Sequence, residues 1–285
     1  MTSVEGRPQL DAFSADATPD ADGAAAPRDT GRRVALLVAP VVGLALLFGG
    51  WELYVRISGV RPLTLPRPSD VVIHIAENPG FYVDNARVTV VEAFWGFVFA
   101  FVAGVVVAVF MAHSRFMERA TMPVIVLLQS MPVAALAPVF LIWFGFTMTP
   151  KVLIAALFAF IPFVANALTG FRAIDAHSYE LMRSVDASRW EIFWKLRFPS
   201  SLPYLFSAGR ICVGLALVGA VIGEFYGGST EGLGYQLRSA QSRLVVDQIW
   251  GSIFVLALIG VVTTLALAAL ERWLLRWHTS QSLTR

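Results

Sequence analysis

The sequence contains few charged residues and few of the side chains that build catalytic or metal sites. Only 15% of its 285 residues are charged, whereas a soluble domain has about 25%. This deficit indicates a chain that lies in lipid. The one cysteine, Cys212, lies inside an apolar run, so no disulfide framework or cysteine-based metal site is possible. We interpret Cys212 as a small buried hydrophobe.

Motifs of hydrolases and of ATP-binding proteins are also missing. The histidines are scattered over separate segments without a His-Glu-x-x-His zinc pair, and no Gly-x-Ser-x-Gly nucleophile turn occurs. These absences argue against a membrane-embedded enzyme. No Gly-x-x-x-x-Gly-Lys-Ser/Thr loop is present to cradle phosphates. We therefore expect that this chain binds no cofactor.

The first 31 residues contain no apolar stretch of helix length. They are rich in Ala, Asp, Pro, Ser and Thr, a composition that predicts a disordered tail. They also lack the basic region and following apolar stretch of a signal peptide. We expect a disordered cytoplasmic tail over residues 1–31 and a transmembrane domain over residues 32–285 that begins with an uncleaved helix.

Long apolar stretches, in contrast, are abundant. A bilayer core of about 30 Å needs about 20 mostly apolar residues in a helix, and six stretches qualify. They are too long and too continuously apolar for the strands of a β-barrel. We predict an all-α membrane protein with about six transmembrane helices, over Val34–Ile57, Val88–Ala112, Met122–Gly145, Lys151–Phe171, Leu205–Phe225 and Trp250–Trp273.

The distribution of positive charge predicts the orientation of these helices, because cytoplasmic segments carry an excess of Lys and Arg. With the N-terminus inside, fourteen basic residues fall on the cytoplasmic side and seven on the opposite side. We expect a multi-pass protein of the cell (inner or cytoplasmic) membrane with both termini in the cytoplasm.

Small residues and prolines predict how the helices pack and bend. Rows of small residues at four-residue spacing let helix backbones approach closely. The spacing fits a partner helix from this chain or from another copy, and we favour this chain. The rows are Gly96, Ala100, Gly104 and Ala108 in the second span and Gly219, Gly223 and Gly227 in the fifth. Prolines inside the third and fourth spans predict bends, at Pro123, Pro132, Pro138 and Pro162.

Several polar residues lie in or near the predicted spans, where charge is costly and often functional. Glu52, Glu92 and Arg210 are close enough to span ends for their side chains to reach the interface by snorkelling. Glu224 precedes a glycine-rich loop, and Gln129 and Asn166 lie deeper. We take Gln129, Asn166 and Glu224 as candidates for lining a translocation path.

The segment 175–199, between the fourth and fifth spans, predicts two short amphipathic helices joined by a tight turn. Asp175 can cap the first helix, and Asp186 falls at the turn. Ser188 and Glu191 have the spacing of a capping box for the second helix, which Phe198-Pro199 ends. Apolar residues recur at helical spacing on both, at Tyr179, Met182 and Val185 and at Trp190, Phe193 and Leu196.

An apolar stripe on such helices must be covered by something. It can lie against the underside of the helix bundle, at the lipid interface, or in a groove of a partner protein. Periodicity alone leaves these three alternatives open.

The same segment resembles the EAA loop of ABC-type importer permeases, whose pattern is Glu-Ala-Ala-x-x-x-Gly-Ala followed by an apolar residue and Pro. Glu180, Ala187 and Pro199 match this pattern, while Leu181, Met182 and Asp186 depart from it. The change from Gly to Asp is mild at a left-handed turn, because Asp adopts that conformation more readily than most residues.

Other segments extend the resemblance over roughly residues 60–275. They are similar to the binding-protein-dependent permeases of the nitrate/sulfonate/taurine group, and they are Leu65–Ser69, Gln129–Pro138, Trp143–Gly145, Gly219–Phe225 and Gly232–Gly234. Within that group, Leu181–Ser184 and Trp277-His278 most resemble permeases for thiamine precursors and riboflavin-like heterocycles.

The resemblance implies a permease subunit of a type I ATP-binding-cassette importer, which is a transport component and not an enzyme. It would translocate a small solute delivered by an extracytoplasmic solute-binding protein. That solute would be a sulfonate-, nitrate- or taurine-type anion or a thiamine-precursor or riboflavin-like heterocycle. The resemblance also implies a permease homodimer in the bilayer and a separate ATPase subunit that uses the ATP.

On this reading the loop 175–199 couples the permease to the ATPase. Glu180, Arg183, Asp186 and Ala187 would form the coupling surface. Trp190 and Phe193 would anchor the second helix, which would end at Pro199.

The alternative is a secondary transporter or channel that works without an ATPase. The scarcity of deep ionisable groups and the lack of an obvious inverted repeat argue against it.

Overall fold

A computed structural model describes residues 30–61, 63–226 and 229–275, and no strand occurs in these ranges. The chain divides into two units, Met1–Gly50 and Trp51–Arg285. Of the predicted tail, residues 1–29 lie outside the described ranges, and helix α1 (Thr30–Ser58) begins at its end. Gly227, Trp277 and His278 also lie outside them.

Five helices of the described chain are long and apolar enough to cross a membrane. They confirm five of the six predicted spans, with ends shifted by several residues. They are the Val38–Ser58 part of α1, α3 (Pro79–His113), α6 (Met148–Arg172), a helix over Arg189–Tyr226 that includes α9 (Phe198–Tyr226), and α11 (Val246–Leu274).

The third predicted span, Met122–Gly145, is not one helix. It consists of α4 (Arg115–Ser130) followed by the pair η1 (Val133–Leu136) and α5 (Ala137–Phe144), bent by 88° relative to α4. The break follows from Pro132, because a proline pushes the preceding residue out of the helical region. Met131 has φ −81° and ψ 137°, which is extended. The prolines therefore break this span, and a sixth crossing exists only if both pieces together form it.

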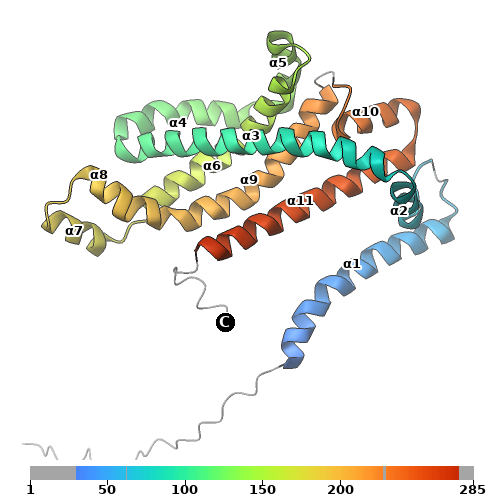
Figure 1. Cartoon of the computed structure of the whole chain (residues 1–285), viewed down its shortest axis with the longest axis horizontal. Coiled ribbons are helices and arrows are strands. Elements are labelled where there is room, and N and C mark those ends of the chain that lie inside the picture. Colours follow the sequence, from blue (N-terminus) through green and yellow to red (C-terminus); the bar gives the residue numbers. More distant parts are fainter. Residues whose placement is uncertain (1–29, 62, 227–228, 276–285) are drawn as a thin grey trace, which may run out of the picture. The chain divides into compact units, whose positions relative to one another are not determined.

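The centre of the second unit is α6, which packs against α3 and α9 (Figure 1). The predicted rows of small residues face these contacts. A Cβ on Gly104 would lie 2.8 Å from the Cβ of Phe163, and a Cβ on Gly219 would lie 2.6 Å from the Cα of Ala155. Both neighbours belong to α6, so the described glycines of both rows pack within the chain, as predicted.

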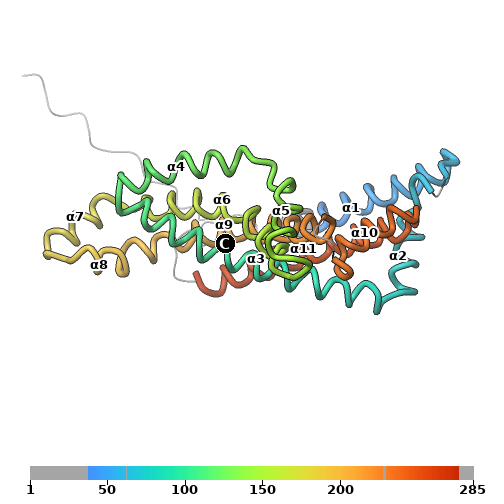
Figure 2. The backbone as a smooth tube through the Cα atoms, turned by 90° about the horizontal axis from the view of Figure 1, so that it is seen from above, coloured from blue at the N-terminus to red at the C-terminus, as the bar shows by residue number. Residues whose placement is uncertain are grey.

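The two ends of this helix bundle carry different short helices. The helices α7 (Ala176–Ser184) and α8 (Arg189–Ile192) lie at one end, which we call the hairpin end. The helices α2 (Pro68–Glu77) and α10 (Leu233–Arg243) lie at the opposite end, the α10 end (Figures 1 and 2). Neither α2 nor α10 is among the helices predicted from the sequence, because both are shorter and more polar than a span.

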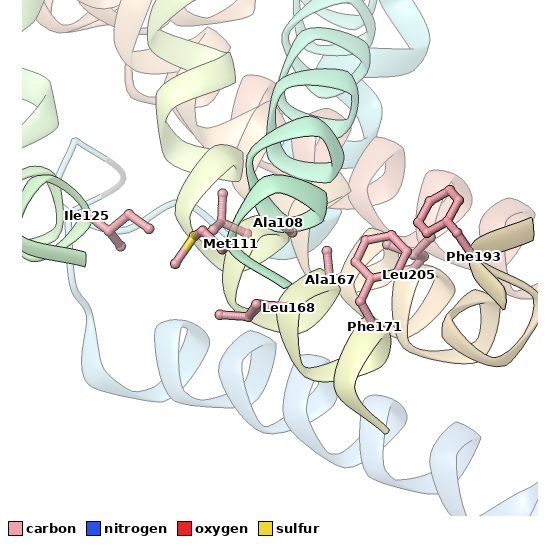
Figure 3. Packing of buried hydrophobic residues seen from close by; sticks show 9 residues of the cluster. Ala108, Met111, Ile125, Ala167, Leu168, Phe171, Phe193 and Leu205 are labelled. Atoms are coloured by element: carbon pink, nitrogen blue, oxygen red, sulfur yellow. The ribbon is translucent and has the colours of Figure 1, made fainter. Parts of the chain in front are cut away.

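A hydrophobic cluster fills the bundle near the hairpin end. Residues of α3, α4, α6 and α9 contribute to it, and the buried Phe193 joins them from the segment that follows α8. Figure 3 shows Phe193 directed toward Leu205 and Phe171. The Phe171 and Phe193 ring centroids are 5.9 Å apart. The chain that leaves the hairpin is therefore packed into the core of the bundle.

Candidate functional site

The first hairpin helix begins as predicted. Asp175 is the N-cap of α7, and its carboxylate accepts the backbone N–H of Ser178 at 2.9 Å. The Ser178 hydroxyl also donates to this carboxylate. These two hydrogen bonds stabilise the ionised form and lower the pKa of Asp175 below its usual value.

The turn between the two helices has the geometry of a Schellman motif. Asp186 adopts φ 54°, the left-handed conformation predicted for it. Its N–H donates to the carbonyl of Arg183, and the N–H of Ala187 donates to the carbonyl of Met182. This pattern usually places glycine at the left-handed position. Asp186 therefore occupies the left-handed position that glycine usually takes in this motif.

The second hairpin helix begins with the predicted capping box. The backbone N–H of Glu191 donates to the Ser188 hydroxyl at 3.2 Å, and the N–H of Ser188 donates to the Glu191 carboxylate at 3.0 Å. Each side chain satisfies a backbone donor that the helix leaves free. Capping thus fixes the direction in which α8 leaves the turn.

The predicted end of that helix at Pro199 is wrong. The segment η2 (Phe193–Arg197) is a π-helical turn that joins α8 to α9, so the chain is helical from Arg189 to Tyr226. Pro199 lacks the N–H that an α-helix would bond to the carbonyl four residues earlier. A wider π turn just before Pro199 accommodates this defect without ending the helix. The hairpin therefore continues directly into a membrane-spanning helix.

The predicted coupling residues divide into an exposed and a buried group. Glu180, Arg183 and Asp186 are exposed, and Ala187 is half-buried. Trp190 is 68% exposed and Phe193 only 8%. Of the two predicted anchors, only Phe193 therefore packs into the bundle.

The hairpin also exposes apolar side chains. Leu181 and Val185 are 66% and 67% exposed, while Tyr179 and Met182 are half-buried. Together with Trp190 they form an apolar surface interspersed with charges at the hairpin end. We call Glu180, Leu181, Arg183, Val185, Asp186 and Trp190 the hairpin surface.

The α10 end contains a buried polar network that the sequence analysis missed. Glu92 is buried and does not reach an interface by snorkelling as predicted, because Lys151 of α6 supplies a counter-charge at 2.8 Å. Lys151 also donates to the Ser229 hydroxyl at 2.9 Å. Glu52 and Arg210, in contrast, form partly exposed ion pairs near helix ends, with Arg56 and Glu271.

The start of α10 is held by three side chains from the spans. The N–H groups of Gly232 and Leu233 donate to Asn85 and Thr89 of α3, each at 2.9 Å. The N–H of Gly234 donates to the carboxyl of Glu224 on α9. The first amides of a helix have no partner within it, so these side chains complete α10. Asn85, Thr89 and Glu92 follow one another at helical spacing, a polar stripe that could have indicated this contact.

The three predicted path residues have different surroundings. Gln129 is exposed near the end of α4, and Asn166 is half-buried and donates to the Pro162 carbonyl of its own helix at 2.8 Å. Glu224 is fully buried beneath the start of α10. In this conformation Gln129 and Asn166 remain candidates for a path, whereas Glu224 is enclosed by protein.

The chain is similar to known components of membrane transport systems. A family profile described as "Binding-protein-dependent transport system inner membrane component" matches residues 100–278. The formylaminopyrimidine transport permease ThiX of Halalkalibacterium halodurans is 31% identical over 243 residues, which is 85% of this chain and 96% of that protein. The riboflavin transport system permease RibX of Chloroflexus aurantiacus is 34% identical over 241 residues, 84% and 90% of the two chains.

The fold itself resembles that of solved ABC importers. An inward-facing structure of the MetNI methionine ABC transporter matches with a TM-score of 0.57 and 18% identity, over 67% of this chain and 95% of the other. This likeness confirms the predicted type I permease architecture.

Proposed function

Because the chain belongs to the family of binding-protein-dependent transport system inner membrane components, we propose that its hairpin, residues 175–199, docks a separate ATP-binding-cassette ATPase. The chain is a permease subunit of an ABC importer located in a membrane, and it is a transport component rather than an enzyme. The observation that carries the proposal is the exposed hairpin surface at the end of a helix continuous with a span.

The composition of the hairpin surface suits a protein partner. Leu181, Val185 and Trp190 are each about two-thirds exposed, which is costly for large apolar side chains in water. Amphipathic helices of this kind lay their apolar residues into grooves of partner proteins, and tryptophan often supplies much of the binding energy. Glu180, Arg183 and Asp186 lie among them and provide charge specificity.

The connection between hairpin and span supports mechanical coupling. Phe193 is packed against Phe171 of α6, and the same continuous helix places Gly219 in contact with the backbone of α6 at Ala155. A displacement of the hairpin by the ATPase is therefore transmitted along α9 to its close contact with α6. In this proposal ATP is bound and hydrolysed by the partner, and this chain binds no nucleotide.

We also propose the assembly and its orientation. The hairpin end faces the cytoplasm with both termini, in the cytoplasmic membrane, and the α10 end faces the solute-binding protein. Two copies of the permease together form the pathway. The excess of basic residues in the segments predicted to be cytoplasmic supports this orientation.

For the solute we propose a heterocycle of the thiamine-precursor or riboflavin type. Support comes from the two relatives above, whose names give formylaminopyrimidine and riboflavin as their solutes. Titration of the cognate solute-binding protein with a formylaminopyrimidine, riboflavin and taurine tests this choice. Tight binding of taurine alone would contradict it.

Co-purification tests the docking site. We expect Glu180→Ala and Asp186→Lys to reduce recovery of the ATPase with the permease, while the permease still inserts into the membrane. Glu231→Ala is the matched control, because Glu231 is an exposed carboxylate at the opposite end of the bundle. Normal ATPase recovery and normal uptake with both hairpin variants would refute the docking site.

Reconstitution tests the importer against the alternative of a secondary transporter. We expect solute uptake into liposomes only when the ATPase, ATP and the solute-binding protein are present. Uptake by the permease alone, driven by an ion gradient, would show that the ATPase is not required.

A further inference from the structure

Two buried glutamates and one buried lysine lie at the α10 end. Glu92 is 2% exposed and Glu224 is 0% exposed, and the neighbouring Lys151 is 8% exposed. The Lys151 ammonium donates to Glu92 Oε1 at 2.8 Å. If all three groups were ionised, the cluster would carry a net negative charge without a counter-ion, which is strongly unfavourable in a buried site.

The remaining carboxyl oxygens indicate how this charge is removed. Glu92 Oε2 and Glu224 Oε1 are buried, and neither receives a donor from any other group in the described ranges. Each carboxyl group lies close enough to the other to interact with it electrostatically. Ionised carboxylates only accept hydrogen bonds, so a bond between two of them requires a proton on one.

The neighbours decide which carboxyl carries that proton. Glu92 is paired with Lys151, which favours its ionised form. In the part of the chain that the structure describes, Glu224 forms no ion pair, and its Oε2 accepts the neutral N–H of Gly234. A proton on Glu224 Oε1 would let this group donate to Glu92 Oε2, and would give both oxygens a partner.

We propose that Glu92 and Glu224 form a proton-binding site, and that its proton holds the segment 229–234 on the helix bundle. Two hydrogen bonds of this segment end on the cluster, from Gly234 to Glu224 and between Lys151 and Ser229. Gly232 lies directly over the Glu224 carboxyl with φ 99°, a conformation that favours glycine. A Cβ at this position would collide with that carboxyl.

The surroundings give the proton a route to water. A cavity of about 590 Å³ reaches Glu92 and Lys151 and is also lined by Asp84, Arg87 and Glu231. Toward α11 the network continues through neutral groups, from Asn85 through Gln236 to Gln248. The nearest acidic residue of α11 is Asp247, which interacts electrostatically with Tyr82. Loss of the proton to water in the cavity would leave two carboxylates facing each other, and their repulsion would separate them.

The direction of the pH effect follows from proton release. The closed cluster holds one proton, whereas an opened cluster exposes glutamates that are ionised near neutral pH. As long as the closed cluster binds one proton more than the opened cluster, each unit rise in pH makes opening of the segment about tenfold more favourable. The effect stops once the closed cluster has also lost its proton.

Infrared spectroscopy of the purified full-length chain in lipid nanodiscs tests the proton site directly. We expect a carbonyl band of a protonated carboxyl group at neutral pH, which disappears at high pH. Glu224→Gln should lack the band, because the amide replaces the proton as donor to Glu92. Glu231→Gln, an exposed control in the same segment, should retain it. Absence of the band from the unmodified chain, or its persistence in Glu224→Gln, would overturn the proposal.

Hydrogen exchange tests whether the proton holds the segment 229–234 on the helix bundle. After correction for the intrinsic pH dependence, exchange of amides 232–236 should accelerate by about tenfold per pH unit in the unmodified chain. In Glu224→Gln it should be independent of pH. A pH dependence that is equal in the two proteins would show that the proton does not hold the segment. Neither measurement depends on the ATPase or on the solute.

Discussion

The contact between α9 and α6 gives a sharp prediction for the substitution Gly219→Ala. A Cβ at this position would lie 2.6 Å from the Cα of Ala155, 3.0 Å from the carbonyl oxygen of Ile154 and 3.1 Å from the backbone nitrogen of Ala155. All three atoms are backbone atoms of α6. No side-chain rotation can relieve the collision, so the two helices must move apart.

The magnitude combines two opposing effects. Overpacking in a core costs about 1–3 kcal/mol, and a collision with backbone atoms belongs near the upper limit. Alanine is favoured over glycine in a helix interior by about 1 kcal/mol. We therefore expect Gly219→Ala to lower the free energy of unfolding by about 2 kcal/mol.

The matched control is Gly214→Ala in the same helix. A Cβ on Gly214 meets no atom within 4 Å, so only the helix-propensity effect remains, and this variant should be stabilised by up to about 1 kcal/mol. Both variants and the unmodified chain can be compared by titration with a denaturing detergent, with unfolding followed by tryptophan fluorescence. If Gly219→Ala unfolds at the same or a higher detergent fraction than Gly214→Ala, the close α6–α9 contact is refuted.

Three further predictions concern the hairpin. Asp186→Gly should slow hydrogen exchange in the turn by stabilising it by up to about 1 kcal/mol, because glycine adopts the left-handed conformation without strain; faster exchange would contradict the turn geometry. Phe193→Ala should destabilise the chain by about 3–5 kcal/mol, as expected for a buried aromatic residue. Trp190→Ala should leave the stability of the chain unchanged and reduce recovery of the ATPase. An equal loss of stability in both variants would contradict their different burial. The lowered pKa makes the Asp175 cap stabilising above the usual pKa of an aspartate, and this stabilisation is lost as the pH falls through the lowered value. After correction for the intrinsic pH dependence, exchange of the Ser178 amide should therefore accelerate over that interval, and Asp175→Asn should remove this dependence.

The sequence was sufficient wherever local chemistry determines structure. Long apolar stretches require helices in a bilayer, which explains why five of the six spans were predicted. Capping at Asp175 and Ser188 and the turn at Asp186 were also predicted correctly, because these motifs depend on residues close together in the chain. The EAA-like pattern gave the family for the same reason, since its residues lie within one short segment.

Predictions were wrong where the effect of a proline on a helix depends on the tertiary packing around it. The prolines predicted a bend in the third span, but only the structure showed that the backbone at Met131 is extended and that the helix breaks there. Pro199 was expected to end a helix, yet a π turn preserves it. The packing of Phe193 in the core favours this continuous helix, and a proline signal read in isolation omits that contribution.

The sequence by itself determined that the chain is a helical membrane protein with a capped hairpin and a permease-like loop. Only the tertiary structure decided that Glu92 is buried with Lys151, 59 residues away, and that Glu224 lies beneath the start of α10. Hydrophobicity along the chain cannot reveal such contacts, because the cost of burying a charge depends on partners brought near by helix packing. The candidate coupling surface is therefore largely a property of one segment, whereas the proton-binding site exists only in the folded bundle.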